Sequence, residues 1–565
     1  MKLNLVIGGE AGQGLATLNK ILSKTFFRMG FNIYSSKDYE SRVRGGHNFM
    51  SIRFGTEEVS GPEVKEDILL ALNQETIKVH QDKVSDDGYI LYDGIMEDLD
   101  KELISIEAKK VAKEVGNHKA ANIVFVGAVL KLLGLDLDLS KEVIKDYFAS
   151  KGEDVLKTNL EALEKGYEEL EVKLKLPEVS PRKDEILIDG NQALGLGAIT
   201  GGVQFYSAYP MTPATGVMNY IASKENELGI VVEQAEDEIA AIMMALGGSY
   251  SGIRSMTGSS GGGFALMVEA LGLAGIAEIP LVIAEVQRPG PATGLPTRTE
   301  QGDLLFAINA SQGDFPLMVI APRDNEDAFY QSFRAMNIAE NYQMPVVILS
   351  DQFLADSKKN IKDFDFEALE IKDGFISDEE AAKIKDYKRY QFTEDGISPL
   401  AYPGQIVDDV VLIDSDEHDQ KGHIIEDSET RIKMVDKRAK KLEKLIAEDL
   451  LEPKYIGPEE IDYLLVGWGS TYGPLLEARE LLEDEGNRIG LLSFSDVWPL
   501  ATSKLIELIN NNSAELIVVE NNATGQFAKL IRSESGIAAN YQILKYDGRP
   551  FSGKEIYHRA EEVIR

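Results

Sequence analysis

The sequence predicts a multidomain α/β protein. Its 565 residues suffice for about three or four domains, at roughly 100–200 residues each. Short apolar runs alternate with helical stretches, a pattern that is typical of mainly parallel sheets covered by helices. Loops rich in glycine or proline follow several of the apolar runs, and ligands of such folds bind at the carboxyl ends of the strands. These loops are therefore the places where a site is expected.

Residues 1–180 are expected to form the first α/β domain. The apolar run at 3–7 leads into a glycine-containing loop at 8–14, and an amphipathic helix follows at 15–29. Residues 155–185 are rich in Lys and Glu and end among prolines, which predicts a helix, then a linker, and a boundary near 180. Further strands are expected at 52–54, 68–72, 89–91 and 123–126.

Residues 181–355 alternate most regularly, which predicts a doubly wound parallel sheet with helices on both faces. Helices are expected at 238–250 and 263–277, among others. The expected strands are 185–188, 204–209, 230–234, 253–256, 281–285, 317–320 and 346–349.

The last two segments differ from each other. Residues 356–455 are highly charged and contain a charged helical stretch at 431–449, so we interpret them as an extended connector. Residues 456–565 return to an α/β pattern, which predicts a further domain. Its expected elements are strands at 463–467, 489–493 and 516–520 and a helix at 474–485.

The composition narrows the classes of partner. Lys and Arg total 59 and Asp and Glu total 94, so the formal net charge is −35. Such a chain repels nucleic acid and anionic lipid, and a basic protein surface is the better partner. Because cysteine is absent, this chain alone cannot build a disulfide, a zinc–thiolate site or an iron–sulfur cluster. The most apolar stretch, at 263–286, contains Glu269, Glu278 and Pro280, so we expect no membrane span; the N-terminus does not resemble a signal peptide, which favours the cytoplasm.

Two features of the first domain could bind an anion. The loop at 8–14 includes Gly12 and Gly14 and opens a helix, where free N–H groups receive phosphates. The loop matches neither a Walker motif nor a clean Gly-x-Gly-x-x-Gly pattern, and its glycines would also serve a tight turn alone. Arg42 and Arg44 precede a glycine pair, which indicates an anion contact or an interface, or else a polar turn with surface arginines.

A threonine framed by prolines follows the expected strand at 204–209. Pro210 and Pro213 restrict the backbone on both sides of Thr212, so its hydroxyl is held ready to donate to a bound oxygen. The alternative is that this loop only ends the strand and begins a helix at Pro213.

Three carboxylates follow the expected strand at 230–234. Glu236 lies earliest at the junction of strand and helix, and we expect it to be the chemical group, because burial there can raise the pKa of a carboxyl. Asp237 and Glu238 are expected to cap the next helix and to favour its dipole.

Two later loops complete the candidate residues. Residues 257–263, which include Gly258 and Ser259, predict a flexible turn that a ligand or another backbone can approach closely. Arg288 follows the expected strand at 281–285, and its guanidinium would bind a carboxylate bidentately or pair with a nearby glutamate. The six histidines show no metal-ligand spacing, so no metal site is expected.

These motifs together resemble the alpha subunit of the 2-oxoacid:ferredoxin oxidoreductases, with a gamma domain fused at its N-terminus. The loop at 8–14 and Ser-Arg-Val-Arg-Gly-Gly-His at 41–47 look like the gamma domain, and Tyr-Pro-Met-Thr-Pro at 209–213 looks like the pyrimidine-binding domain. Met211 and Ala214 depart mildly from residues common in the family, and the N-terminal loop has one glycine before Gln13 where two are common. The other similar segments are 258–263, 287–297 and 300–304 in the pyrimidine-binding domain, 387–404 and 416–419 in the connector, and 463–500 in a transketolase-C-like domain.

The resemblance implies a thiamine diphosphate bound between the pyrimidine-binding domain and a separate beta subunit. The beta subunit would supply the Mg²⁺–diphosphate site and a [4Fe–4S] cluster, which fits a redox chain without cysteine. The implied reaction is the oxidative decarboxylation of a 2-oxoacid with coenzyme A, with electrons passing to ferredoxin, in a heterodimer or a dimer of heterodimers. 2-Oxoglutarate is favoured because the fused arrangement is common among its enzymes. Pyruvate, branched-chain and aryl 2-oxoacids stay open, as does a non-catalytic assembly subunit.

The resemblance also implies roles for single residues. Glu236 would hold a proton at N1′ of the aminopyrimidine, and Arg288 would bind the substrate carboxylate. Thr212 and Thr297 would hydrogen-bond that carboxylate or the oxo oxygen. The other residues expected at the cofactor are Tyr209, Pro210, Gly258 and Ser259, and those expected at coenzyme A or an interface are Gly12, Gly14, Arg42 and Arg44.

Overall fold

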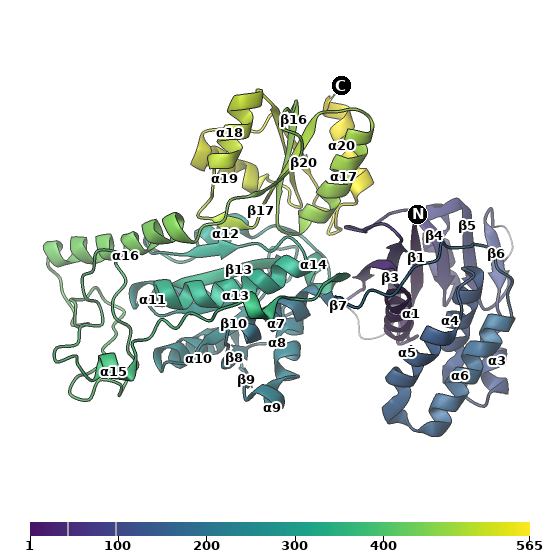
Figure 1. Ribbon diagram of the computed structural model, residues 1–565, viewed down its shortest axis with the longest axis horizontal. Helices are drawn as coiled ribbons and strands as arrows, with labels where there is room; N and C mark the ends of the chain where they lie inside the picture. The colour runs from purple at the N-terminus through teal and green to yellow at the C-terminus, as the bar shows by residue number, and fades with distance from the viewer. Residues whose placement is uncertain (42–44, 97–98, 565) are drawn as a thin grey trace. The chain divides into compact units, whose positions relative to one another are not determined.

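The computed structural model describes residues 1–41, 45–96 and 99–564 (Figure 1). The chain forms two compact units. The first unit comprises Met1–Ile188 together with Ser357–Asp363, and the second comprises Asp189–Asp356 and Phe364–Arg565. Within the described part of the chain, no helix combines the length and the apolar character needed to cross a membrane.

The first unit is built on an eight-stranded sheet of order β6-β5-β4-β1-β3-β2-β14-β7. Its β6–β5–β4–β1 half is parallel, but β3 runs antiparallel to β1 and β2, and β14 runs antiparallel to β2. The expectation of a mainly parallel sheet therefore holds for one half only. The strands are β1 (Lys2–Ala11), β2 (Asn32–Asp38), β3 (Gly45–Gly55), β4 (Glu66–Ala71), β5 (Val84–Tyr92), β6 (Glu102–Ser105), β7 (Glu185–Asp189) and β14 (Lys358–Lys362).

Helices cover both faces of this sheet because consecutive residues of its central strands are apolar and point to opposite faces. Leu5 and Ile7 of β1 pack toward the main helical layer, whereas Val6 packs toward the opposite face. The main layer contains α1 (Leu15–Met29), α3 (Ala108–Glu114), α4 (Ala121–Leu132), α5 (Asp138–Phe148) and α6 (Glu153–Glu168), and the opposite face carries α2 (Gln74–His80).

The strand expected at 123–126 is wrong, because these residues lie in α4. An apolar run predicts a strand and a fully buried helix equally well, and all four residues are buried under α6 and the sheet. The two helices approach closely at Gly127, where a Cβ atom would lie 2.1 Å from the carbonyl oxygen of Leu163. Glycine at this position therefore permits the contact between α4 and α6.

The strand expected at 185–188 forms, but in a different sheet. It is β7, which lies beside β14 at the edge of the first unit and not in the sheet of the second. β14 is fixed there by side chains: Asn360 Oδ1 accepts a hydrogen bond from the Ile33 amide at 2.6 Å, and the Tyr34 and Ser357 hydroxyls lie 2.8 Å apart. The chain thus leaves the first unit after β7 and returns to it for β14.

The second unit contains a seven-stranded sheet of order β18-β12-β13-β11-β10-β8-β9. All pairs are parallel except β12–β18, as expected for a doubly wound fold with one added edge strand. The strands are β8 (Phe205–Ala208), β9 (Val231–Gln234), β10 (Ser255–Ser259), β11 (Leu281–Gln287), β12 (Met318–Ile320), β13 (Pro345–Asp351) and β18 (Asp496–Trp498).

Alternate residues of β11 pack into two cores. Leu281 and Ile283 pack with α10 (Glu238–Tyr250) and α11 (Gly261–Ile276), whereas Val282 and Ala284 pack on the opposite face. That opposite face is covered by α7 (Gly190–Thr200), α8 (Thr215–Ala222) and α13 (Asn325–Tyr342).

The last part of the chain forms a third sheet, with the strand order β15-β17-β16-β19-β20. Its core is continuous with the core over α10 and α11. The strands are β15 (Lys454–Ile456), β16 (Tyr463–Trp468), β17 (Ile489–Phe494), β19 (Glu515–Glu520) and β20 (Tyr541–Leu544), and the helices are α17 (Tyr472–Asp484), α18 (Ser503–Asn512), α19 (Gln526–Ser535) and α20 (Gly553–Ile564).

The charged connector is attached to the second unit by a buried ion cluster. Its long helix α16 (Ser428–Glu448) carries Lys437 and Lys441, and both ammonium groups contact the carboxylate of Glu278. Lys437 Nζ lies 2.7 and 2.8 Å from the two carboxylate oxygens, and Glu278 is 1% exposed. Burial opposes ionisation of Glu278, but Lys437 and Lys441 outweigh it and lower the pKa of this carboxyl.

We expect Glu278→Gln to lower the free energy of unfolding by about 3–5 kcal/mol, because two ammonium groups stay buried without their counter-charge. The midpoint of urea unfolding, followed by tryptophan fluorescence, measures this loss. The matched control is Glu429→Gln, which removes an exposed ion pair with Lys433 on the same helix and should change stability by less than about 0.5 kcal/mol. Equal midpoints for the two variants would contradict this account of the cluster.

Candidate functional site

The candidate site lies at the carboxyl ends of β8, β9, β10 and β11 in the second unit. The loops that leave these parallel strands meet at one edge of the sheet, where ligands of doubly wound folds bind. Three groups from separate loops come together there: the carboxyl of Glu238, the guanidinium of Arg288 and the backbone of Thr212.

Glu238 is the buried carboxylate of the loop after β9. It is the first residue of α10, is 4% exposed, and its Oε1 has no hydrogen-bond partner. Asp237 caps the helix as expected, since its Oδ1 accepts from the Ala240 amide at 2.8 Å. The side chain of Glu236 is exposed. Of the three acidic residues, Glu238 is therefore the one placed inside the site.

The sequence carries a signal for Glu238 that the strand-to-helix argument missed. The buried face of α10 includes Ala241 and Ala245, and a residue three positions before Ala241 lies on the same face of the helix. Glu238 occupies that position, whereas Glu236 precedes the helix. A carboxylate on the apolar face of a helix is the rarer arrangement and the stronger indication of function.

Polar side chains closely approach two glycines in this part of the sheet. A Cβ atom on Gly263 would lie 2.0 Å from Ser259 Oγ and 2.6 Å from Glu238 Oε1, so these two oxygens converge beside Gly263. A Cβ atom on Gly258 would lie 2.4 Å from the hydroxyl of Tyr206, whose pKa is raised by burial. Thr257, Gly258 and Ser259 belong to strand β10 and residues 261–263 belong to α11, so the flexible turn expected at 257–263 is wrong.

Arg288 follows β11 and faces the same space. Its Nη1 donates a hydrogen bond to the Thr212 carbonyl oxygen at 2.7 Å, while its buried Nε has no partner. Burial lowers the pKa of Arg288, and the negative charge of Glu238 opposes this shift. The guanidinium is thus held near Glu238 with donor capacity left for an anion.

The remaining predicted residues surround this group at different depths. Thr297 is buried in the loop after Arg288, and its carbonyl accepts from Arg298 Nη1 at 3.1 Å. Pro210 is half-buried and Tyr209 is exposed on the loop that carries Thr212.

Beside the site, the second unit exposes an apolar surface. Val231 of the edge strand β9 and Ile239, Met243 and Met244 of α10 are exposed large apolar residues, as is Tyr209. Contiguous apolar surface and an unpaired strand edge are features that proteins normally cover. This surface is therefore a candidate contact for a partner protein.

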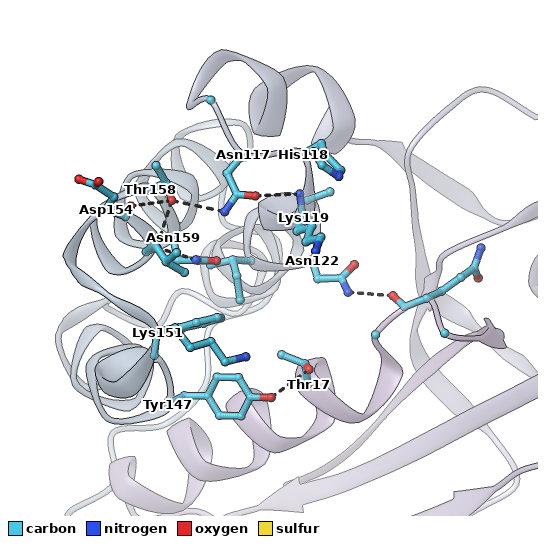
Figure 2. A pocket seen from close by; sticks show the side chains of 18 residues that line it. Thr17, Asn117, His118, Lys119, Asn122, Tyr147, Lys151, Asp154, Thr158 and Asn159 are labelled. Atoms are coloured by element: carbon cyan, nitrogen blue, oxygen red, sulfur yellow. Dashed lines mark hydrogen bonds between the residues drawn. The ribbon is translucent and has the colours of Figure 1, made fainter.

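A second candidate site is a cavity of about 950 Å³ in the first unit (Figure 2). It begins at the loop after β1, where Gly12 and Gly14 have left-handed backbone angles and where Asn122 Nδ2 donates to the Gln13 carbonyl oxygen at 2.8 Å. Lys119 and Lys151 also line it. Two ammonium groups beside a strand-to-helix loop favour an anion.

The opposite wall of this cavity is polar and partly aromatic. The hydroxyls of Thr17 and Tyr147 lie 3.2 Å apart, Lys151 Nζ lies 5.3 Å from the Tyr147 ring, and Asp154 adds one carboxylate (Figure 2). Gly12 and Gly14 thus line this cavity, and their contact with an anion stays a prediction. Arg42 and Arg44 lie outside the described residues. Among the described residues no group of three or more His, Asp or Glu side chains is arranged to hold a metal ion.

Comparison with known proteins shows which class of protein has this fold and site. Residues 196–437 match the model of the thiamine diphosphate-binding domain of pyruvate flavodoxin/ferredoxin oxidoreductase, and residues 4–169 match a pyruvate ferredoxin/flavodoxin oxidoreductase model. The second unit thus contains a thiamine diphosphate-binding domain, and the fold and site define an oxidoreductase subunit of this type.

Individual relatives narrow the class to a family. The alpha subunit of 2-oxoacid:ferredoxin oxidoreductase from Sulfolobus sp is 34% identical over 100% of this chain and 97% of its own length. The 2-oxoglutarate synthase subunit KorA of Methanothermobacter thermautotrophicus is 30% identical over 67% of this chain and 97% of its own. The solved 2-oxoglutarate:ferredoxin oxidoreductase from Magnetococcus marinus, with 2-oxoglutarate, coenzyme A and succinyl-CoA bound, has a TM-score of 0.93 and 33% identity over the full length of both chains.

The chain belongs to the 2-oxoacid:ferredoxin oxidoreductases, and it corresponds to their alpha subunit. An alpha subunit has other subunits as partners.

Proposed function

We propose that this chain, together with a beta subunit, oxidatively decarboxylates 2-oxoglutarate with coenzyme A to succinyl-CoA and CO₂. The observation that carries the proposal is the unpartnered Oε1 of Glu238, which is buried near Arg288 at the strand ends. The choice of acid is supported by relatives named for 2-oxoglutarate and by a structural neighbour with 2-oxoglutarate bound.

The residues at this edge fit thiamine diphosphate. Glu238 Oε1 is a buried polar atom that lacks a partner, and Gly263 carries no side chain where Glu238 Oε1 and Ser259 Oγ converge. Bound thiamine diphosphate supplies the nucleophilic carbon and the electron sink that decarboxylation of a 2-oxoacid requires. Tyr209, Pro210, Gly258 and Ser259 would line its binding surface.

In this proposal Glu238, and not the exposed Glu236, is the acid that holds a proton at the pyrimidine nitrogen. Asp237 fixes the first turn of α10 by its hydrogen bond to the Ala240 amide, so the carboxyl of Glu238 has a defined position. A proton transfer needs a donor within hydrogen-bond reach of the acceptor, and an exposed side chain before the helix does not have that fixed position.

Arg288 is the proposed binding group for the 2-oxoacid carboxylate. The Thr212 carbonyl oxygen orients its guanidinium at 2.7 Å, and a partly buried guanidinium forms strong charge-assisted hydrogen bonds to carboxylates. The hydroxyls of Thr212 and Thr297 would bind the same carboxylate or the oxo oxygen.

The beta subunit is proposed to carry the Mg²⁺–diphosphate site and the iron–sulfur cluster, and ferredoxin to accept the electrons. A chain without cysteine has no thiolates for a cluster, so that cofactor must be held elsewhere in the complex. The exposed apolar residues around β9 and α10 support the proposal that the beta subunit covers the site from this side.

Dye reduction by the natively purified complex under anaerobic conditions tests this function. We expect reduction with 2-oxoglutarate that depends on coenzyme A, and slower reduction with pyruvate, 2-oxoisovalerate or an aryl pyruvate. A preference for one of those acids would replace the substrate and keep the reaction. A complex that holds thiamine diphosphate and its cluster but reduces dye with none of these acids would instead be a non-catalytic assembly.

Glu238→Gln should lower turnover of the complex by about two or more orders of magnitude, because its amide cannot transfer a proton. Glu236→Gln is the matched control, two residues away, and should keep nearly normal turnover. Bound thiamine diphosphate is measured in both variants to separate lost binding from lost chemistry. The reverse result, with turnover lost in Glu236→Gln and kept in Glu238→Gln, would return the role to Glu236.

We further propose that the cavity of the first unit binds the phosphates of coenzyme A. Replacing Lys119 or Lys151 by Ala should raise KM for coenzyme A about tenfold, because each substitution removes a charge-assisted hydrogen bond. KM for the 2-oxoacid should stay constant. Lys110→Ala, an exposed lysine of α3 outside the cavity, is the control. An unchanged KM for coenzyme A in both cavity variants would assign the cavity to another anion or to an interface.

A further inference from the structure

The loop that follows β11 is tied to the third sheet at its far end. We name residues 288–303 the substrate loop, because they include the residues proposed to bind the substrate, and they lead into α12 (Leu304–Ile308). The segment at 300–304 hydrogen-bonds to the last part of the chain, residues 456–565, which we name the third-sheet domain. One end of the substrate loop therefore belongs mechanically to that domain.

Gln301 makes most of this connection, and it is 1% exposed. Its amide donates to the Asn521 carbonyl oxygen at 2.7 Å, and its Oε1 accepts from the Asn521 amide at 3.0 Å. Its Nε2 donates to the carbonyl oxygen of Trp468, the last residue of β16, at 2.8 Å. Its own carbonyl oxygen accepts from Asn522 Nδ2 at 3.1 Å. A buried amide whose oxygen and nitrogen are both partnered by backbone groups has one defined position.

Gln526 ties the same segment from the opposite direction. It is the half-buried first residue of α19, where Gly525 before it has a left-handed φ of 62°. Its Nε2 donates to the Gly302 carbonyl oxygen at 2.6 Å, and its Oε1 accepts from the Leu305 amide at 2.9 Å. Each of these two glutamines thus bridges the loop and the third-sheet domain with both ends of its side-chain amide. Gln301 and Gln526 together are named the amide clamp.

Hydrogen bonds connect the clamped end of the loop to its beginning. The Asp303 amide donates to Oε1 of Gln287 at 3.0 Å, and Gln287 is buried directly before Arg288. Gln287 Nε2 in turn donates to the carbonyl oxygen of Ser350 on β13 at 3.1 Å. The two ends of the substrate loop are therefore joined beside the residue whose guanidinium is proposed to bind the substrate.

A second path runs along the loop itself. The Leu295 amide donates to the Pro289 carbonyl oxygen at 3.0 Å, which closes a turn beside the first residue of the loop. The Thr299 amide donates to the carbonyl oxygen of Gly548, in the third-sheet domain, at 3.3 Å. Thr297 lies between this turn and this contact, so its place also depends on the domain that holds Thr299.

We propose that Gln301 and Gln526 are positioning residues through which the third-sheet domain sets the affinity for the 2-oxoacid. The amide clamp holds the substrate loop in the geometry in which Arg288 and Thr297 bind the substrate carboxylate. A binding group is effective only when supporting hydrogen bonds fix it, and a contiguous network of such bonds couples one domain to a site on another. This inference rests on the proposed function, in which Arg288 binds the 2-oxoacid.

The first test measures the hold on the substrate loop without substrate or cofactor. Hydrogen exchange of the full chain, followed by mass spectrometry of peptides from 288–303, should be about tenfold faster in Gln526→Ala, because two hydrogen bonds to the loop end are lost. Lys529→Ala, at an exposed position of the same helix, is the matched control and should exchange like the unaltered chain. Unchanged exchange in Gln526→Ala would overturn the clamp whether or not the proposed function is correct.

The second test measures substrate affinity in the assembled complex by dye reduction. Gln301→Met and Gln526→Ala should raise KM for 2-oxoglutarate about tenfold, while kcat and KM for coenzyme A stay constant, because the change affects the binding of one substrate and not the chemistry. Gln331→Met is the matched control, since Gln331 is also buried but its side chain bonds to Asp327 and Arg334 within α13.

The outcomes separate the clamp from the proposed function. An unchanged KM for 2-oxoglutarate in both clamp variants would overturn the positioning role. A loss of kcat in the clamp variants that the control shares, with KM unaltered, would reduce the glutamines to a structural role and overturn it too. Failure of the unaltered complex to reduce dye would instead overturn the proposed function, and the exchange measurement would still decide whether the third-sheet domain holds the loop.

Discussion

Burial of the Glu238 carboxyl without a hydrogen-bond partner for Oε1 is the constraint around which the site is organised. A polar group in that position costs free energy unless something binds it, and the fold nevertheless keeps it there. Asp237 secures the helix turn that carries it, and Gly263 leaves it space. An apolar residue at this position of α10 would avoid the cost of burying a polar group. The presence of a carboxyl there therefore indicates a ligand.

The same logic extends outward from Glu238. Parallel strands β10 and β11 bring Ser259 and Glu285 side by side, and Arg288 directly follows the last residue of β11. The connector contributes differently: its buried lysines fix α16 at Glu278, just before β11, so the strand that carries these groups is anchored at its start.

Much of this architecture could be predicted from the sequence, because alternation of apolar runs and helices reports directly on sheets and their coverings. The helices at 15–29 and 238–250 have the predicted bounds, and Thr212 and Arg288 meet as loops of one sheet edge should. The strand prediction for residues 123–126 is wrong because an entirely buried helix lacks the periodic polar positions that indicate a helix. Proximity to a strand end favours Glu236, whereas the helical periodicity of α10 places Glu238 on the buried face. The pairing of β7 with β14 depends on contacts far apart in sequence, which local patterns do not contain.

The position of β14 has a consequence for how the protein is made. The first segment of this unit ends in β7. Its sheet also needs β14, whose residues come after residues 189–356 in the sequence. During synthesis, the first unit therefore emerges with an open position next to β2. Residues 189–356, which include strands β8–β13, must be synthesised before β14 can fill that position. Until then the backbone groups of β2 are without their final neighbour. All residues of the first unit are present once Asp363 has been made, before residues 364–565 of the second unit.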